Sequence, residues 1–548
     1  MLGESGHYGG RLVISERTEP KTLNPLTALD GTSRDIIGLI SADLIHINRS
    51  SLGTEAALAK SWEMSPDGRR YTLRLRRGVR FSDGHPFDAD DVVFTFEAYL
   101  DERLHSPQRE LLIISGKPLR VQKLDAYTVR FELPQPYAAA ERLFDSIAIL
   151  PCRLLKPLYK EGKLADAWGL NTPPEQIAGL GPFRVKEYVS GQRIVLESNP
   201  YYWKIDQHGN RLPYLREIVC LLISNPDAET MRFEAGETDV ISRLSAAGYS
   251  TLEKYENARG FRLYDIGPGL EYDFLFFNVN DLVSRPLGSI TYKQTWFRQL
   301  AFRRAISMAI DREAIVRLVY QGRARAMWSH VTPGNKLWVN QEIPTGLHDA
   351  TGARGILRNA GFFWRSDGRL IDPARKPVEF SILHNAGNVQ QMQMATMIQA
   401  DLKEIGIEAH AVPLEFRSML DRIFKTYEYE AAIMALADGD ADPNVEMNVW
   451  VSDGGTHVWD LTPKRKLEPW QEEVDRLMNE QLVTLDYPSR KRLYDRVQRL
   501  IWENLPVICL VGPDILVGAK KRIGNFHPAI LRNHTLWNSE QLFLRQIQ

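Results

Sequence analysis

The feature of this sequence that most limits its possible folds is a regular alternation of strand and helix patterns near residue 400. Apolar strand patterns at 378–383, 407–412 and 430–436 are separated by helix patterns at 389–405 and 415–426. Strand, helix, strand, helix, strand is the order of an open α/β sheet. Ligands of such sheets bind beyond the carboxyl ends of the strands. We therefore expect an α/β fold, with any binding site at that edge.

A second strand–helix–strand pattern lies earlier in the chain. It consists of a strand at 217–223, a helix at 226–236 that ends at a glycine, and a returning strand at 238–241. Such a unit predicts a parallel pair of strands with a right-handed crossover. At 548 residues the chain is also too long for a single hydrophobic core, so we expect several domains.

The segment 65–100 predicts a turn, a strand, a second turn and a capped helix. Pro66, Asp67 and Gly68 are turn residues, and apolar and polar residues alternate along 71–76. Asp88, with Asp91 three residues later, is a helix start signal for a helix beginning near Ala89. Together with a second hairpin that includes 127–133, these elements predict a small α+β subdomain.

Composition and charge exclude several classes of function. The chain has 68 basic and 69 acidic residues, a net charge of −1, so nothing favours a nucleic acid or an anionic membrane as partner. It has no run of about 18 apolar residues, and so no predicted transmembrane helix. The first seven residues are polar and small, unlike a signal peptide, so export would require that a leader has been removed. Cys152, Cys220 and Cys509 lack CxxC spacing, which excludes a disulfide framework.

No local motif predicts catalysis. The sequence contains no GxSxG elbow, no GxxxxGK[ST] loop and no HExxH helix, and its 12 histidines are scattered. The GxG at 179–181 lacks a third glycine, and Pro182 removes an amide donor, so we do not expect dinucleotide binding. We therefore predict a protein that is not an enzyme, with no cofactor and no metal. Six arginines at 69–80 alternate along a strand, which predicts a solvated sheet face.

Three segments resemble a known family. They read W-x-x-S-P-D-G…Y-T-x-x-L-R-x-G-V-x-F-x-D-G-x-P-x-x-A-x-D-V-x-F-x-F from Trp62, G-x-G-P-F-x-x-x-x-x-x-x-G-Q-x-I-x-L-x-x-N-P-x-Y-W from Gly179, and R-R-A-I-S-x-A-I-D-R-x-A-I-V from Arg303. This order resembles the family 5 extracytoplasmic solute-binding proteins, the peptide, dipeptide and nickel binders of ABC importers. The matches run in the right order from about residue 18 to residue 506.

The resemblance implies an α/β, two-lobed periplasmic-binding-protein fold (class II, cluster C type) with an extra α+β subdomain in lobe one. Lobe one would comprise 8–45, 176–275 and 506–548, the subdomain 46–175, and lobe two 276–505. The resemblance also implies a periplasmic or extracytoplasmic monomer that captures a small solute, a peptide first, between its lobes and delivers it to ABC permease membrane subunits. Nucleic acid is not among the implied partners.

The acidic run after the strand at 430–436 is the sharpest candidate for solute binding. In the resembled peptide binders, an aspartate within D-x-x-D-P pairs with the α-ammonium of the ligand, and this chain offers Asp438, Asp440 and Asp442 with a spacing that differs by one residue. A buried carboxylate could make a strong, charge-assisted hydrogen bond to an ammonium. The alternative is that Asp442, which precedes Pro443, caps the following helix.

Other candidates rest on position. His384 and Asn385 end a strand at the expected sheet edge, Glu19 lies in a proline-containing loop that borders the cleft in the resembled family, and Trp450 could stack on a ligand or belong to the core. The loop of Glu19 could equally be a surface turn. Because Leu436-Ala437 replaces the family's upstream Gly-Trp, an oligosaccharide or other non-peptide solute is the second hypothesis, with nickel or haem third. A secreted hydrolase is the alternative of another class.

Overall fold

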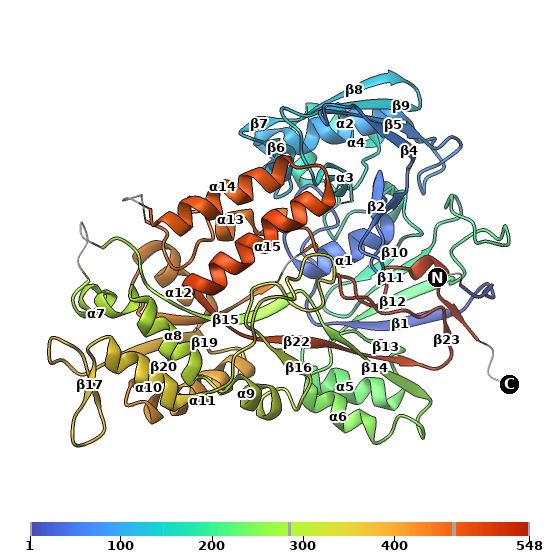
Figure 1. The fold of residues 1–548 in the computed structure, drawn as a ribbon. Helices are drawn as coiled ribbons and strands as arrows, with labels where there is room; N and C mark the ends of the chain where they lie inside the picture. The colour runs from blue at the N-terminus through green and yellow to red at the C-terminus, as the bar shows by residue number, and fades with distance from the viewer. Residues whose placement is uncertain (1–2, 146, 283–286, 438, 463–466, 546–548) are drawn as a thin grey trace. The chain divides into compact units, whose positions relative to one another are not determined.

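The computed structural model describes residues 3–145, 147–282, 287–437, 439–462 and 467–545. The chain divides into two compact units, 1–266 with 516–548 and 267–515. Each unit has its own α/β core (Figure 1). The finer division predicted from the sequence, with 46–175 as a separate subdomain, stays a prediction.

The main sheet of the first unit has β1 at its centre. Its strand order is β10-β11-β12-β1-β13-β22, with β14 also paired to β22. Strand β1 runs parallel to both β12 and β13. The strands are β1 (Arg11–Glu16), β10 (Phe183–Val189), β11 (Arg193–Ser198), β12 (Glu217–Leu222), β13 (Val240–Ile241), β14 (Phe261–Pro268) and the C-terminal part of β22 (Val507–Lys520).

The predicted direct pairing of the strands at 217–223 and 238–241 is wrong. Strand β1 lies between them, with Ile14 opposite both Cys220 and Val240. The two strands are parallel, as expected, but the N-terminal strand takes the central place. Ile14 is buried, and β1 satisfies backbone hydrogen bonds on both edges there. Local sequence does not reveal this, because the inserted strand lies about 200 residues away.

Helices of the first unit begin at side-chain caps. Helix α5 (Pro226–Ala235) is capped by Asn225 and ends at Gly236, whose positive φ of 84° suits glycine. Helix α1 (Gly31–Ile40) begins at Asp30, which accepts a hydrogen bond from the Ser33 N–H. The sequence analysis predicted α5 but missed α1. Helix α6 (Ala246–Glu253) follows β13, and the C-terminal strands β23 (Ile523–Gly524) and β24 (Phe543–Leu544) form a hairpin.

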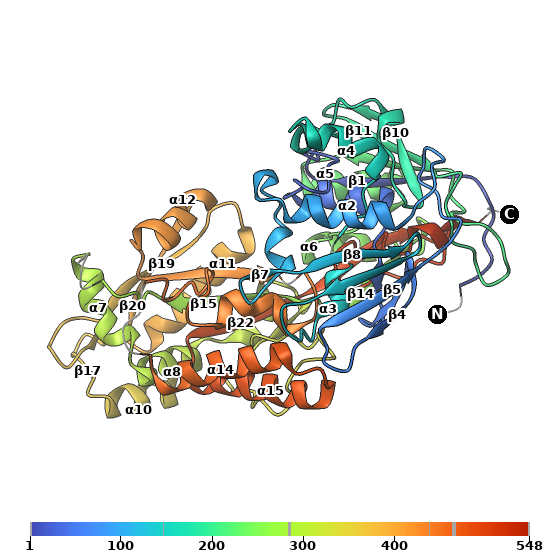
Figure 2. The ribbon, with the colours of Figure 1, turned by 90° about the horizontal axis from the view of Figure 1, so that it is seen from above.

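A four-stranded antiparallel sheet in the first unit confirms the hairpins predicted around 65–133. Its order is β4-β5-β9-β8, and helix α2 (Ala89–Leu100) packs against β8 and β9 (Figure 2). The predicted capping box of α2 is present, formed by Asp88 and Asp91. The strands are β4 (Ala59–Met64), β5 (Arg70–Leu75), β8 (Arg120–Asp125) and β9 (Thr128–Glu132). Smaller neighbours are β2 (Ile45–Ile47), β3 (Thr54–Ala56), β6 (Ile113–Ile114), β7 (Lys117–Pro118), α3 (Ala140–Leu143) and α4 (Cys152–Lys160).

The second unit contains the α/β alternation from which its fold was predicted. Its strands run in the order β22-β15-β21-β19-β20, and β19 is parallel to both β20 and β21. The elements are β15 (Glu271–Phe277), β19 (Glu379–Asn385), α11 (Val389–Glu404), β20 (Glu408–Leu414), α12 (Phe416–Asp421) and β21 (Ala431–Ala437). The predicted helix at 415–426 is shorter than expected, because a π-helical turn, η5 (Arg422–Thr426), follows α12.

Side chains of β15 alternate between two hydrophobic clusters on the two faces of this sheet. Leu275 and Phe277 pack into one cluster with α8, α10 and α11, whereas Phe274 and Phe276 pack into the other with α14 and α15. Figure 1 shows α14 and α15 side by side on one face. The further helices are α7 (Ser289–Phe297), α8 (Leu300–Ala309), α9 (Arg312–Leu318), α10 (Ala350–Asn359), α13 (Met447–Trp450), α14 (Pro469–Val483) and α15 (Tyr487–Asn504).

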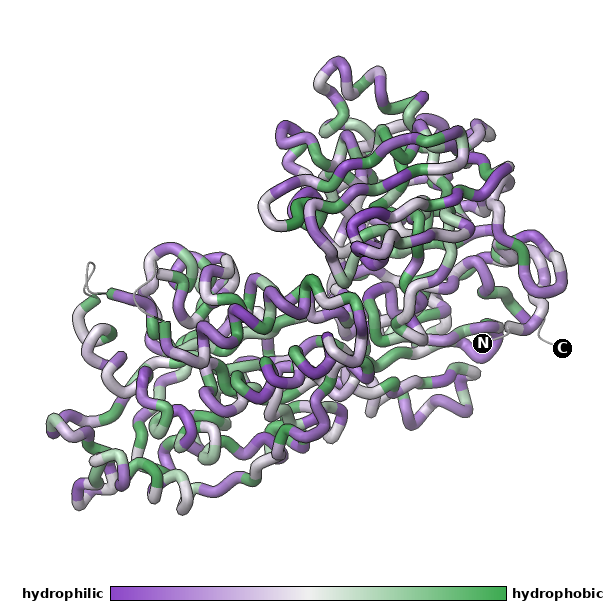
Figure 3. The backbone as a smooth tube through the Cα atoms, turned by 45° about the horizontal axis from the view of Figure 1, so that its top comes forward, coloured by the Kyte–Doolittle hydropathy of each residue, from purple (hydrophilic) through white to green (hydrophobic). Residues whose placement is uncertain are grey.

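Several helices are amphipathic; α15, for example, buries Tyr494, Val497 and Ile501 while other residues of the helix stay exposed. Figure 3 shows hydrophobic and hydrophilic residues alternating along such helices. Within the described residues, no helix is both long enough and apolar enough to cross a membrane.

Candidate functional site

A cavity of about 430 Å³ lies within the first unit, beyond the carboxyl ends of β1 and β13. Strand β1 contributes Ser15 and Glu16, and Arg243 follows β13. The first turns of α1 and the C-terminal segment 532–536 complete the wall. This is the sheet edge at which α/β folds hold ligands.

Most polar groups of the cavity are already paired with each other. Arg532 donates to both oxygens of Asp35, at 3.0 and 3.2 Å. Glu229 accepts from Arg17 at 2.8 Å and from the Ser15 hydroxyl at 2.5 Å. Two pairs of hydroxyl groups, each 2.7 Å apart, link the remaining walls: Thr18 with Thr32 and Ser242 with Thr535. These pairs fix the shape of the cavity.

Glu16 and Arg243 are the exceptions. Within the described part of the chain, neither the Glu16 carboxylate nor the Arg243 guanidinium has a hydrogen-bond or ion-pair partner, although both line the cavity. Glu16 is half-buried and Arg243 is exposed. Burial, with the Asp35 carboxylate nearby, raises the pKa of Glu16 from the ordinary 4.5 to about 8, and Arg243 offsets only part of this rise.

Glu19, a predicted solute-binding residue, is bound to the neighbouring hairpin of β10 and β11. Its carboxylate accepts from the Tyr188 hydroxyl at 2.5 Å and from the Gly191 N–H at 2.7 Å. These hydrogen bonds hold the pKa of Glu19 below its ordinary value. Glu19 therefore anchors its loop, and a contact with a ligand stays a prediction.

In the second unit, Asp442 is bound by its own chain. Arg490 donates to both carboxylate oxygens, at 2.6 and 2.7 Å. Asp442 also accepts from the Asn444 N–H and caps the short helix η6 (Pro443–Glu446). Helix capping is the alternative to ligand binding that the sequence analysis gave for Asp442. Asp440 accepts from the Ala441 N–H at 2.6 Å, and Asp438 lies outside the described residues. A ligand role for any of the three stays a prediction.

Trp450 belongs to the core of the second unit. Its side chain is buried, donates to Glu446 at 2.8 Å and packs against His330 and Trp459. This is the core alternative considered in the sequence analysis. Stacking of Trp450 on a ligand stays a prediction.

The carboxyl ends of β19 and β20 carry an exposed apolar edge, formed by Val389, Met392 and Phe416. These side chains are 55%, 45% and 50% exposed, at the first turns of α11 and α12. His384 and Asn385 end β19 beside them. His384 is buried, whereas the half-buried Asn385 accepts from the Gly387 N–H at 3.0 Å. The sequence analysis predicted this edge but not its apolar residues.

The sequence analysis missed the residues of the charged cavity. Asp30, three residues before Ser33, was a usable signal for α1, which supplies Asp35. No local signal connects Glu16 with Arg532, because they are about 500 residues apart in the chain.

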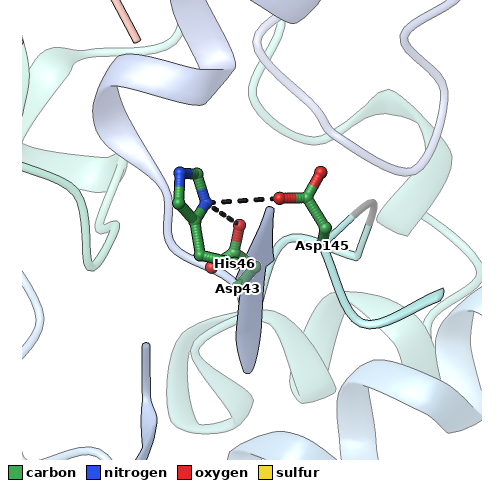
Figure 4. A group of neighbouring side chains, drawn as sticks. All are labelled: Asp43, His46 and Asp145. Atoms are coloured by element: carbon green, nitrogen blue, oxygen red, sulfur yellow. Dashed lines mark hydrogen bonds and ion pairs between the residues drawn. The ribbon is translucent and has the colours of Figure 1, made fainter. Parts of the chain in front are cut away.

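One cluster has the residue types of a metal site. His46 Nδ1 lies 3.0 Å from an Asp43 oxygen and 3.2 Å from an Asp145 oxygen, as Figure 4 shows. Burial alone would lower the pKa of His46, but the two carboxylates outweigh it and raise the pKa to about 10. Arg49 also pairs with Asp145, at 3.0 Å. A protonated ring between two carboxylates, with a second cation beside it, is an ion-pair network.

An α/β fold of two units, with a charged cavity beyond the carboxyl ends of its strands, defines a ligand-binding protein. The model of the bacterial extracellular solute-binding proteins, family 5 Middle, matches residues 53–457. The chain belongs to this family, whose members are substrate-binding components of ABC transporters. The resemblance found in the sequence is thereby confirmed, as is the two-lobed α/β class of fold.

Relatives match over nearly their whole length. A probable ABC transporter-binding protein of Deinococcus radiodurans is 27% identical over 90% of this chain and 85% of the relative. The di/tripeptide-binding protein 1 of Pseudomonas aeruginosa is 25% identical, over 95% and 92%. The solved structure of the oligopeptide-binding protein AppA of Bacillus subtilis, in complex with a nonapeptide, is 25% identical with a TM-score of 0.73, covering 99% of this chain and 100% of that one.

Proposed function

We propose that this protein captures a peptide-like solute outside the cytoplasm and delivers it to the membrane subunits of an ABC importer. The observation that carries the proposal is the cavity at the carboxyl ends of β1 and β13, in a chain of the solute-binding family. The names of the Pseudomonas and Bacillus relatives support a peptide over other solutes. We further propose that the protein acts as a monomer and does not turn its solute over.

The two units expose different kinds of surface. The first unit offers charged groups in its cavity, and the second offers the apolar edge of Val389, Met392 and Phe416. Peptides carry both polar main-chain groups and apolar side chains, so both kinds of surface are chemically suited to a peptide. Closure of the units around a solute would require a higher affinity for the closed state.

Native mass spectrometry of the freshly purified protein tests this function. We expect a ladder of co-purified masses that correspond to peptides. A single sugar mass would contradict the peptide assignment and favour the oligosaccharide alternative. Hydrolysis of added peptides by the purified protein would instead overturn the assignment as a binding protein.

Asp440 is one of the described candidates for an α-ammonium contact. If it has that role, Asp440→Asn weakens binding of peptides with a free amino terminus much more than binding of N-acetylated peptides, because only the former carry the charge. Equal losses for the two kinds of peptide would assign Asp440 to structure.

A further inference from the structure

The charges of the first-unit cavity do not all cancel in pairs. Three acidic side chains and three basic side chains line it, and two pairs are closed by the contacts of Arg532 with Asp35 and Arg17 with Glu229. Glu16 and Arg243 are left over. A half-buried carboxylate is poorly solvated and needs a cation to stay ionised, whereas an exposed guanidinium is solvated by water. Glu16 is therefore the residue that lacks a counter-ion.

The hydrogen bonds of the cavity wall also indicate that acceptor groups are left for an occupant. The wall hydroxyls are paired among themselves or with Glu229, as described above. His534 Nδ1 lies 2.8 Å from the Ala529 carbonyl oxygen, to which it donates. Burial lowers the pKa of His534, so the ring is neutral and Nε2 is left as an acceptor. Glu16 and His534 thus offer acceptors to an occupant, and Arg243 is the cationic side chain of the cavity that has no ion-pair partner among the described residues.

We propose that this cavity is the specificity pocket of the solute site and that it takes a cationic, donor-rich group, a primary ammonium or a guanidinium. Glu16 is the counter-charge, and Arg243 binds a carbonyl or carboxylate of the same solute. This assignment rests on the proposed function, since it presupposes that a solute is captured. It narrows the solute class to peptides, or related molecules, that carry a basic side chain.

Proton linkage follows from the surroundings of Glu16. The charged and titratable groups that line the cavity with it are Asp35 of α1, Glu229 of α5, Arg17, Arg243, Arg532 and His534. With a pKa raised to about 8, Glu16 is mostly protonated at pH 7 in the free protein. A bound cation favours the ionised form, so binding releases a proton. The affinity for a basic solute should therefore rise from pH 6 to pH 8.

The test compares the tripeptides Ala-Lys-Ala and Ala-norleucine-Ala by isothermal titration calorimetry, in two buffers of different ionisation enthalpy. We expect the lysine peptide to bind about tenfold tighter and to release a proton at pH 7. Glu16→Gln should bring the affinity ratio close to one. Glu161 is an exposed glutamate of the same unit, so the control variant Glu161→Gln should retain the wild-type affinity ratio. Equal affinities in the wild type, or a preference that survives Glu16→Gln, would overturn the pocket assignment.

A second measurement separates failure of the pocket from failure of the proposed function. If neither tripeptide binds, the peptide assignment is contradicted, but the pocket is still tested with n-butylammonium against n-butanol. The carboxyl ¹³C resonance of Glu16 is identified by its loss in Glu16→Gln. Saturating n-butylammonium should move the titration midpoint of Glu16 to lower pH, and n-butanol should not. An unchanged midpoint with n-butylammonium would overturn the proposal.

Discussion

Arg490 and Asp442 form a buried, bidentate ion pair inside the second unit. Nη1 lies 2.6 Å from Oδ2 and Nη2 lies 2.7 Å from Oδ1, and each side chain is 5% exposed. Arg490 also donates to the carbonyl and the side chain of Gln481. The pair connects the acidic loop after β21 to α15, so it orients that loop.

Arg490→Met should destabilise the protein strongly, by about 3–5 kcal/mol, because it leaves the Asp442 carboxylate buried without a cation. Chemical denaturation followed by circular dichroism measures this. Arg476 pairs with Glu473 on an exposed helix face, so Arg476→Ala is the control and should leave the unfolding midpoint unchanged. A small effect of Arg490→Met would mean that solvent reaches Asp442.

Glu16→Gln should change how stability depends on pH. Glu16 is neutral in the folded protein up to about pH 8 but ionises above about pH 4.5 when unfolded. The wild type therefore loses stability as the pH rises from 4.5 to 8. After discounting for partial solvent access, we expect Glu16→Gln to be more stable than the wild type by about 1–3 kcal/mol at pH 8.5, and equally stable at pH 4. Thermal unfolding across this range checks it, and parallel pH profiles would be evidence against the raised pKa.

Gly179→Ala should disturb α1 and with it the cavity. A Cβ at residue 179 would lie 1.8 Å from the Ile40 carbonyl oxygen, at the end of α1, so the backbone would have to move. We expect a loss of about 1–3 kcal/mol and weaker solute binding. Gly169 has open space around its Cβ position, so Gly169→Ala is the matched control. Similar melting temperatures for the two variants would show that residues 179–181 can shift freely.

His46→Asn should lower stability at neutral pH by about 1–3 kcal/mol, because Asp43 and Asp145 lose the cation between them. The pKa of His46 is raised from 6.5 to about 10, so its contribution is full below pH 6.5 and is lost as the pH rises to 10. The melting temperatures of wild type and variant should converge over that range. Zinc ions that raise the melting temperature of the wild type would instead reveal a metal site.

Local patterns predicted much of the fold because they depend on neighbouring residues. The strand and helix order of 378–436 and the capping box at Asp88 are visible in the sequence, since side-chain periodicity and capping act over a few residues. Helix α1 was missed although Asp30 marks its start. The central place of β1 could not be predicted, because strand order depends on which distant edges pair.

The candidate site was less predictable than the fold. The sequence pointed to an acidic run, but whether a carboxylate is available for a ligand depends on its surroundings. Asp442 is occupied by Arg490, 48 residues later, whereas Glu16 stands in an ordinary strand and has no such partner among the described residues. Neither the pairing of Asp442 nor the lack of a partner for Glu16 can be predicted from neighbouring residues in the sequence.

The GxG at 179–181 is a second case in which sequence and structure give different information. The sequence analysis predicted no dinucleotide binding there, because the third glycine is missing and Pro182 removes an amide donor. Only the structure gives the glycines a role: Gly179 and Gly181 allow close contact with the end of α1, where the Gly181 N–H donates to the Ile40 carbonyl at 3.1 Å.

By itself, the sequence determined the family and the α/β class, because periodicity and motif order are local properties that survive without coordinates. Only the tertiary structure decided which charges are cancelled and which remain. Electrostatic pairing depends on distance in space and on burial, and the chain brings together Glu16, Arg243 and Arg532 from positions hundreds of residues apart. Asp442 of the acidic run is thus paired with Arg490 of its own unit, whereas Glu16 of β1 has no ion-pair partner among the described residues.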